Sequence, residues 1–221
     1  MKLHLAVDVD GVLRNFVDGL YEMIIAEDPT ITDRIRPPHT LDSFHIQNIA
    51  EDEDTRQAIM DFAFNEPETS YRLFRWSRPL YRELDRYKKL YRSLKENEDT
   101  DWTISICSSQ HTPHQRQATA DWLAAHEVPH DNSIMTSTGK GGFGFDVVID
   151  DHIDNCLDVL QSGGYSILKQ LPHSETREHE LDQYGKFCTK IRSLSSAGPV
   201  LQNIVRHKVS QDQQNRQYQH A

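Results

Sequence analysis

The chain has 221 residues, of which 37% are hydrophobic and 26% are charged, and its formal net charge at pH 7 is −10. This length suits one sizeable α/β core with an inserted or appended subdomain, but it is short for two independent domains. The negative charge excludes binding of polymeric nucleic acid through a broad basic face. A small anionic substrate is compatible with it, because a bound cation and one or two lysines can supply positive charge locally.

The three cysteines, Cys107, Cys156 and Cys188, lie far apart and form no C-x-x-C pair. They therefore predict neither a zinc site nor a redox motif, and they fit a reducing compartment. The N-terminal segment meets a charge within a few residues, and no later run approaches ~18 consecutive apolar residues. We expect a cytoplasmic protein without a membrane partner, and the sequence leaves open whether it forms a homodimer.

The first expected strand covers Leu3 to Val7, a short apolar run that ends abruptly at the carboxylates of Asp8 and Asp10. Such a run is typical of a strand that delivers its carboxyl end to a loop. Apolar residues then recur at helical spacing from Phe16 to Ile24. This pattern predicts an amphipathic helix that ends near Asp28, because the following proline disfavours helical backbone before it.

Residues 16–76 lack strand signals, and we expect them to form a small, mostly helical cap inserted after the first strand. The segment contains the Pro37-Pro38 break and one further expected helix over residues 55–64. A long surface helix should follow from Ser77 to about Asn97, because its apolar residues fall on one helical face.

The remainder of the chain alternates between strands and helices. Strands are expected at 102–107, 132–137, 146–149 and 165–169, with helices from 112 onward and at 153–161. The first of these helices has a clear start signal, since Thr112 and Gln115 have the spacing of a capping box and Pro113 follows the cap. The alternation predicts a Rossmann-like, doubly wound parallel sheet, in which ligands bind beyond the carboxyl ends of the strands.

These elements divide the chain into an α/β core of residues 1–15 and 77–195 and the cap of residues 16–76. The segment 196–221 is rich in glutamine and lacks apolar periodicity after Val205. We therefore expect a polar, frayed C-terminal tail.

Polar side chains gather at or near the ends of several expected strands. They are, in chain order, Asp8, Asp10, Ser108, Ser109, Lys140, Asp150 and Asp151. Phosphoryl transfer needs such a set, because its catalysis is mostly positioning and charge neutralisation around a phosphate. Each residue also has a structural explanation: serines and aspartates at strand ends often begin the next helix, and Lys140 lies among glycines in a loop.

Clustered ionised carboxylates repel one another unless a cation lies among them, and Mg²⁺ with oxygen ligands is the usual solution. We expect Asp8 and one of Asp150 and Asp151 to bind Mg²⁺, with the backbone carbonyl of Asp10 completing the protein ligands. Asp8 is the expected nucleophile. Asp10, two residues away, is the expected general acid and base, which would protonate the leaving oxygen and later activate water.

Lys140 is expected to pair with both Asp8 and the transferring phosphate. Ser108, through its hydroxyl, and Ser109, among the neighbouring backbone N–H groups, are expected to bind the remaining phosphate oxygens.

The order of these residues resembles the haloacid dehalogenase superfamily of phosphatases. D-V-D-G-V-L from Asp8 to Leu13 resembles its first motif, Ser108 its second, Lys140 its third and V-V-I-D-D ending at Asp151 its fourth. Within the superfamily, D-V-D-G-V-L-R-N-F, I-C-S-S-Q and a lysine ten residues before I-D-D most resemble the 5′(3′)-deoxyribonucleotidases. Four positions depart from that family's usual residues: Asn15, Gln110, Thr138 and His152.

The resemblance implies a Mg²⁺-dependent phosphomonoesterase that acts on deoxynucleoside monophosphates, with Phe16 helping to sandwich the base under the cap. Other aromatic residues in the cap segment are Phe44, Phe62, Phe64, Phe74 and Trp76. They are equally well explained as the cap's own core. Two other functions stay open: a phosphatase for a sugar phosphate or another small ester, and a non-catalytic nucleotide-binding protein.

Overall fold

The computed structural model describes residues 1–41, 46–171 and 177–219, and its centre is a six-stranded parallel sheet. The strands are β1 (Lys2–Val7), β2 (Asp101–Ser109), β3 (Asn132–Thr136), β4 (Val147–Asp150), β5 (Tyr165–Lys169) and β6 (Cys188–Ile191). They lie in the order β3-β2-β1-β4-β5-β6, and every neighbouring pair is parallel. The direction of winding therefore reverses between β1 and β4, which confirms the expected doubly wound α/β fold.

The edge strand β6 was not expected from the sequence. Its four residues alternate little in polarity, and only Ile191 is fully buried. β6 lies at the edge of the sheet, and its first three side chains are only half-buried, so it carries no continuous apolar run. The other five strands coincide with expected ones; β1, β2, β4 and β5 are largely buried runs, whereas β3 is exposed at its first two residues.

Side chains that alternate along the strands form separate cores on the two faces of the sheet. On one face, Leu5 and Val7 of β1 pack in a cluster with α4 (Tyr81–Lys95), α5 (Pro113–Ala125) and α7 (Ala197–Gln219). On the other face, Ala6 packs with Val159 of α6 (Ile153–Gln161). Three 3-10 segments complete this part: η5 (Gly141–Phe143), η7 (Glu178–Phe187) and η8 (Leu194–Ser196).

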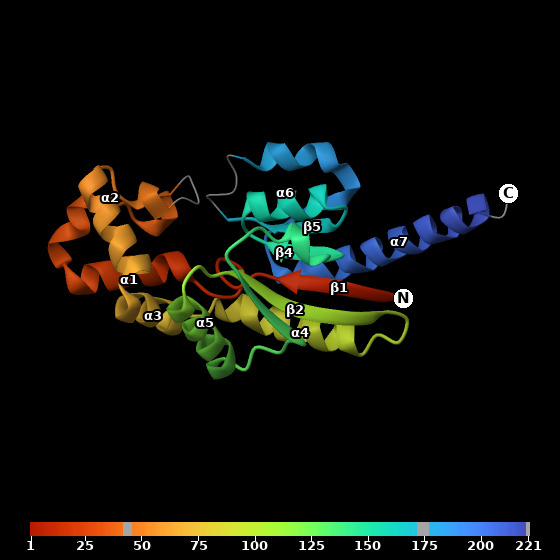
Figure 1. The fold of residues 1–221 in the computed structure, drawn as a ribbon, viewed down its shortest axis with the longest axis horizontal. Coiled ribbons are helices and arrows are strands. Elements are labelled where there is room, and N and C mark those ends of the chain that lie inside the picture. Colours follow the sequence, from red (N-terminus) through yellow and green to blue (C-terminus); the bar gives the residue numbers. More distant parts are fainter. Residues whose placement is uncertain (42–45, 172–176, 220–221) are drawn as a thin grey trace.

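The segment from Phe16 to Trp76 forms a second hydrophobic cluster, which lies toward the carboxyl end of β1 (Figure 1). Its elements are α1 (Phe16–Glu27), η1 (Pro29–Arg34), η2 (Pro38–Thr40), η3 (Ile46–Ile49), α2 (Glu53–Met60), the π-helical turn η4 (Asp61–Asn65) and α3 (Pro67–Trp76). Between residue 50 and Trp76 the sequence indicated one helix, over residues 55–64, whereas the structure has the two helices α2 and α3, because Pro67 starts a new helix at its first position. α3 packs on α5 and so joins this segment to the sheet.

The expectation of a frayed tail after Ser195 is wrong. α7 runs from Ala197 to Gln219, and Ala197, Leu201 and Ile204 are buried in the main core. Their helical spacing buries one apolar stripe, while residues 211–214 of the same helix are exposed. The polar composition of the segment thus reflects two things: the outer face of the docked first part of α7, and the later turn of residues 211–214, which is exposed all round and extends away from the sheet (Figure 1). Within the described residues, no helix has the length and apolar character needed to cross a membrane.

Candidate active site

Three aspartates meet where β1 and β4 end. Asp8 follows β1 directly, Asp150 is the last residue of β4 and Asp151 follows it. The two strands are parallel neighbours, and the backbone N–H of Asp8 donates to the Ile149 carbonyl at 2.9 Å. One carboxylate oxygen from each of the three aspartates lies within 4.8 Å of the others. The structure thus brings together the acidic strand ends that the sequence pattern placed at one site.

Lys140 connects two of these carboxylates. Its Nζ donates to Asp8 Oδ1 at 2.5 Å and to Asp150 Oδ2 at 2.6 Å, and its side chain is fully buried. Burial alone would lower the pKa of Lys140, but the charges of Asp150 and Asp8 outweigh it and raise the pKa above its usual value. The lysine therefore stays charged and fixes the orientation of Asp8.

The glycines around Lys140 allow its loop to pack closely against α6. The backbone N–H of Gly141 donates to Asp158 Oδ2 at 2.5 Å. A Cβ at Gly139 would lie 2.3 Å from the Asp158 carboxylate, and one at Gly141 would lie 2.4 Å from the Ser162 hydroxyl. The position of Lys140 is consequently set by packing, and the competing view of a loose surface loop is wrong.

The electrostatics of the three aspartates favour a bound cation. Burial raises the pKa of Asp8 and of Asp151 well above the usual range, and the neighbouring carboxylates raise both further, while Lys140 opposes the shift. One lysine supplies a single positive charge against three carboxylates. Their grouped oxygens form the hard donor set that Mg²⁺ takes, so Asp8, Asp150 and Asp151 are the residues that would hold the ion.

The side chain of Asp10 points elsewhere. Its Oδ1 accepts from Arg14 Nε at 2.7 Å, and its Oδ2 accepts from Arg14 Nη2 at 2.9 Å and from Gln110 Nε2 at 3.2 Å. Its carboxylate is not one of the three grouped above. Any contribution of Asp10 to a metal site therefore rests on its backbone carbonyl, as expected from the sequence.

Ser108 and Ser109 close the site from the β2 side. They are the last residues of β2, which neighbours β1. Ser108 is buried, and its hydroxyl accepts from Gln110 Nε2 at 3.0 Å, whereas Ser109 is exposed. Both serines line the same pocket as Asp8, so both are placed where a phosphate held at Asp8 would lie.

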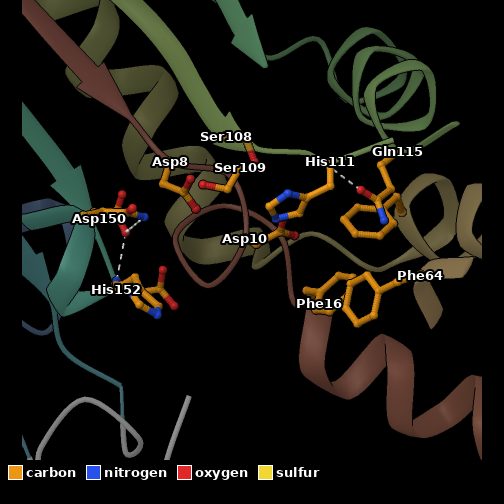
Figure 2. A pocket seen from close by; sticks show the side chains of 13 residues that line it. Asp8, Asp10, Phe16, Phe64, Ser108, Ser109, His111, Gln115, Asp150 and His152 are labelled. Atoms are coloured by element: carbon orange, nitrogen blue, oxygen red, sulfur yellow. Dashed lines mark hydrogen bonds between the residues drawn. The ribbon is translucent and has the colours of Figure 1, made fainter. Parts of the chain in front are cut away.

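This pocket has a volume of about 280 Å³ and two chemically different ends. Figure 2 shows Asp8, Ser108 and Asp150 at one end, Phe16, Phe64 and Gln115 at the other, and Asp10 with His111 between them. The remaining lining residues are Phe74, Ser109, Asp151, His152 and Asn155. The pocket therefore suits a molecule with a charged group and an apolar, planar group.

The aromatic end belongs to the cap's own core as well as to the pocket. The ring of Phe16 lies 4.8 Å from that of Phe74 and 6.1 Å from that of Phe64, measured between centroids. Phe62 packs against the cap core, and Trp76 points away from it with 68% of its surface exposed. Phe44 lies outside the described residues.

No family model and no curated protein matches the chain. Solved structures match it over most of its length. A phosphonoacetaldehyde hydrolase-like protein from Oleispira antarctica is 12% identical, with a TM-score of 0.54 and 92% of each chain covered. β-Phosphoglucomutase from Clostridium difficile is 11% identical, with a TM-score of 0.54 and coverage of 95% of this chain and 100% of the other. A haloacid dehalogenase-like family hydrolase from Streptococcus pneumoniae is 11% identical, with a TM-score of 0.55 and coverage of 85% and 93%.

The chain has the haloacid dehalogenase-like fold. At these identities the likeness concerns the fold, and one fold hosts many functions, so the chemistry has to be argued from the residues themselves. The closer resemblance to the 5′(3′)-deoxyribonucleotidases stays a prediction.

Arg14 is a residue of the site that was not expected from the sequence. Arg14 is completely buried and contacts Asp10 through both carboxylate oxygens. The available signal was a charged residue directly after the apolar pair Val12 and Leu13, four positions after Asp10. Such spacing alone is common on surfaces, which is why it did not stand out.

The four departures from the deoxyribonucleotidase pattern have different structural outcomes. Gln110 contacts Asp10 and Ser108, and His152 lines the pocket while its backbone N–H donates to Asp150 Oδ1 at 2.8 Å. Asn15 instead donates to Asp18 and Thr138 closes a turn with Thr136. Of the four, only Gln110 and His152 therefore contact the site.

Proposed function

We propose that the chain is a Mg²⁺-dependent phosphomonoesterase that acts through an aspartyl-phosphate on Asp8, with a deoxynucleoside monophosphate as substrate. The observation that carries the proposal is the contact of the buried Lys140 with both Asp8 and Asp150, two aspartates that line a pocket ending in phenylalanine rings. The charged end suits a phosphate and the aromatic end suits a base. The motifs' resemblance to the 5′(3′)-deoxyribonucleotidases supports the same substrate.

The residues suggest how the two half-reactions run. Lys140 holds Oδ1 of Asp8, so we assign Oδ2 as the atom that attacks phosphorus. As the new O–P bond forms, the bond to the nucleoside oxygen breaks, and Asp10 gives that oxygen a proton. Asp10 then takes a proton from a water that attacks the phosphorus, the bond to Asp8 breaks, and inorganic phosphate leaves. Mg²⁺, when bound, withdraws charge from the phosphate so that an anionic carboxylate can attack it.

A small free ester is favoured over a polymer end for two reasons. The cap segment contributes Phe16, Phe64 and Phe74 to the pocket, and a cap of this kind encloses small substrates and excludes water. The net charge of −10 also disfavours a long polyanion. The competing substrate is a sugar phosphate, because the structures that share the fold include a phosphoglucomutase.

The proposal is tested by phosphate release from a panel that contains dUMP, dTMP, purine deoxynucleotides and sugar phosphates. Hydrolysis of deoxynucleotides with Mg²⁺, lost in EDTA, is the expected result. Release from sugar phosphates alone would move the substrate to the competing class, and binding of nucleotides without any release would make the protein a non-catalytic sensor.

The covalent step is tested by the Asp8→Asn variant. It keeps the shape of the side chain but removes the nucleophile, so we expect no turnover and no covalent labelling by the substrate phosphate, with a cooperative thermal transition retained. Asp85→Asn, at an exposed position of α4, is the matched control and should keep wild-type activity. Normal turnover by Asp8→Asn would exclude the aspartyl-phosphate.

A further inference from the structure

The guanidinium of Arg14, like the ammonium group of Lys140, lies beside the site and is completely buried. Its side chain is 0% exposed, and it donates four hydrogen bonds: two to Asp10, one to the Phe74 carbonyl at 2.6 Å and one to Thr119 Oγ1 at 3.2 Å. It also lies 5.1 Å from the centroid of the Phe74 ring and 5.4 Å from that of Trp122. A buried guanidinium is costly unless it is paired in this way.

These contacts join three parts of the fold at one point. Asp10 lies in the loop after β1, Phe74 lies in the last turn of α3 in the cap, and Thr119 lies in α5. The Phe74 ring also lines the pocket and packs on Phe16. We call the three rings at the aromatic end of the pocket, Phe16, Phe64 and Phe74, the aromatic wall. Arg14 therefore contacts both the carboxylate of Asp10 and the backbone carbonyl of one residue of this wall, Phe74.

Among the described residues, the contacts of Arg14 and Gln110 with Asp10 leave one acceptor position of its carboxylate unused. A carboxylate has about four lone-pair sites. Arg14 takes one on each oxygen, and Gln110 takes a second on Oδ2. The remaining site is on Oδ1, so the fork of Arg14 selects both the plane of the carboxylate and the oxygen that can carry a proton.

We propose that Arg14 is a positioning residue that holds the Asp10 carboxylate so that its Oδ1 exchanges the proton with the leaving oxygen and with water. Because Arg14 also binds the Phe74 carbonyl, it fixes Asp10 relative to the aromatic wall. The inference rests on the proposed function, because it assigns Asp10 the acid and base role. It differs from that proposal in naming the group that orients Asp10 and the oxygen that acts.

The choice of leaving group separates this role from a merely structural one. A nucleoside alkoxide needs a proton as it leaves, whereas p-nitrophenolate leaves without one. Misorientation of Asp10 should therefore slow the first turnover on a deoxynucleotide but not the first release of p-nitrophenolate from p-nitrophenyl phosphate. The second half-reaction, in which Asp10 activates water, should be slow for both substrates.

The experiment compares wild type, Asp10→Asn, Arg14→Met and Arg14→Lys by rapid mixing with dUMP and with p-nitrophenyl phosphate. For both Arg14 variants we expect kcat on dUMP to fall about 10²-fold or more with little change in KM, approaching the effect of Asp10→Asn. With p-nitrophenyl phosphate we expect a near-stoichiometric burst of p-nitrophenolate followed by slow turnover. Arg14→Lys keeps the buried charge but not the bidentate fork, so it keeps the test open if Arg14→Met does not fold.

Arg78→Met is the matched control, because Arg78 is 73% exposed in its pair with Glu22, and it should behave as wild type. Equal loss of both first turnovers in the Arg14 variants, or wild-type kcat on dUMP, overturns the inference. If wild type hydrolyses p-nitrophenyl phosphate and a sugar phosphate but no nucleotide, the proposed substrate is wrong. The role of Arg14 is then tested by the same comparison, with the sugar phosphate in place of dUMP. If wild type hydrolyses nothing, both the proposed function and this inference fail.

Discussion

At Gly11, the backbone and the packing both require the absence of a side chain. Its φ is +72°, a left-handed conformation that costs a residue with a Cβ more than it costs glycine. A Cβ built there would lie 1.9 Å from Asp151 Oδ2. The glycine after Asp10 therefore does more than turn the chain, because it lets the first loop approach the end of β4 and complete the group of three carboxylates.

Replacing Gly11 by alanine should displace Asp151 and weaken Mg²⁺ binding. In the wild type, Mg²⁺ should raise Tm, since an ion that binds only the folded state stabilises it by mass action. We expect Gly11→Ala to lose most of that shift and most of its activity. Gly142→Ala is the matched control: no atom of the described part of the chain lies within 4 Å of a Cβ there, and both the Mg²⁺ shift and the activity should be kept. An undiminished shift in Gly11→Ala would contradict the assignment of Asp151 as a ligand.

The N-terminus of α5 shows how one short element supports a wall of the pocket. Thr112 Oγ1 accepts from the Gln115 backbone N–H at 3.2 Å, and Gln115 Oε1 accepts from the backbone N–H groups of His111 and Thr112 at 2.8 and 3.1 Å. The capping box predicted from spacing is thus confirmed. It fixes the turn that carries His111 and Gln115 into the lining of the pocket.

Thr112→Ala removes the hydroxyl acceptor from this box and should lower the free energy of unfolding by ~1 kcal/mol. Thr112→Ser keeps the acceptor and should stay close to wild type. Urea unfolding followed by circular dichroism measures both. Equal stability of the alanine and serine variants would mean that the hydroxyl contributes nothing to the start of α5.

Elements and contacts differ in how far the sequence reveals them. β1, β4 and α6 were found because each buries a continuous apolar stretch or stripe, and the placement of Asp8, Asp150 and Lys140 followed from strand ends and spacing. β6 was missed because its four residues, C-T-K-I, carry little apolar pattern and only the last of them is buried. The burial of Arg14 was missed because it depends on α3 and α5 meeting the first loop in space, which the four-residue spacing to Asp10 does not record.

At the scale of the whole molecule, the docked helix α7 and the candidate active site lie toward opposite ends of the sheet. α7 extends from the side where β1 begins, and the cap lies on the side to which β1 points (Figure 1). Leu201 of α7 is fully buried and lines a cavity with Leu90 of α4 and Trp102 at the start of β2. The three grouped aspartates lie at the carboxyl ends of β1 and β4, and Lys140 contacts two of them. None of the described residues that line the pocket belongs to α7, so this helix contributes to the core and not to the pocket.

This separation predicts that damage to α7 will change stability but not catalysis. Leu201→Ala should lower the free energy of unfolding by about 2–5 kcal/mol, because it removes a buried leucine from the main core. Gln202→Ala, on the exposed side of the same helix, should change it by less than about 0.5 kcal/mol. Both variants should keep the wild-type kcat and KM at temperatures well below their Tm. Among the described residues, Leu201 does not line the pocket. A loss of kcat in folded Leu201→Ala would therefore mean that the far end of the sheet controls the geometry around Asp8 indirectly.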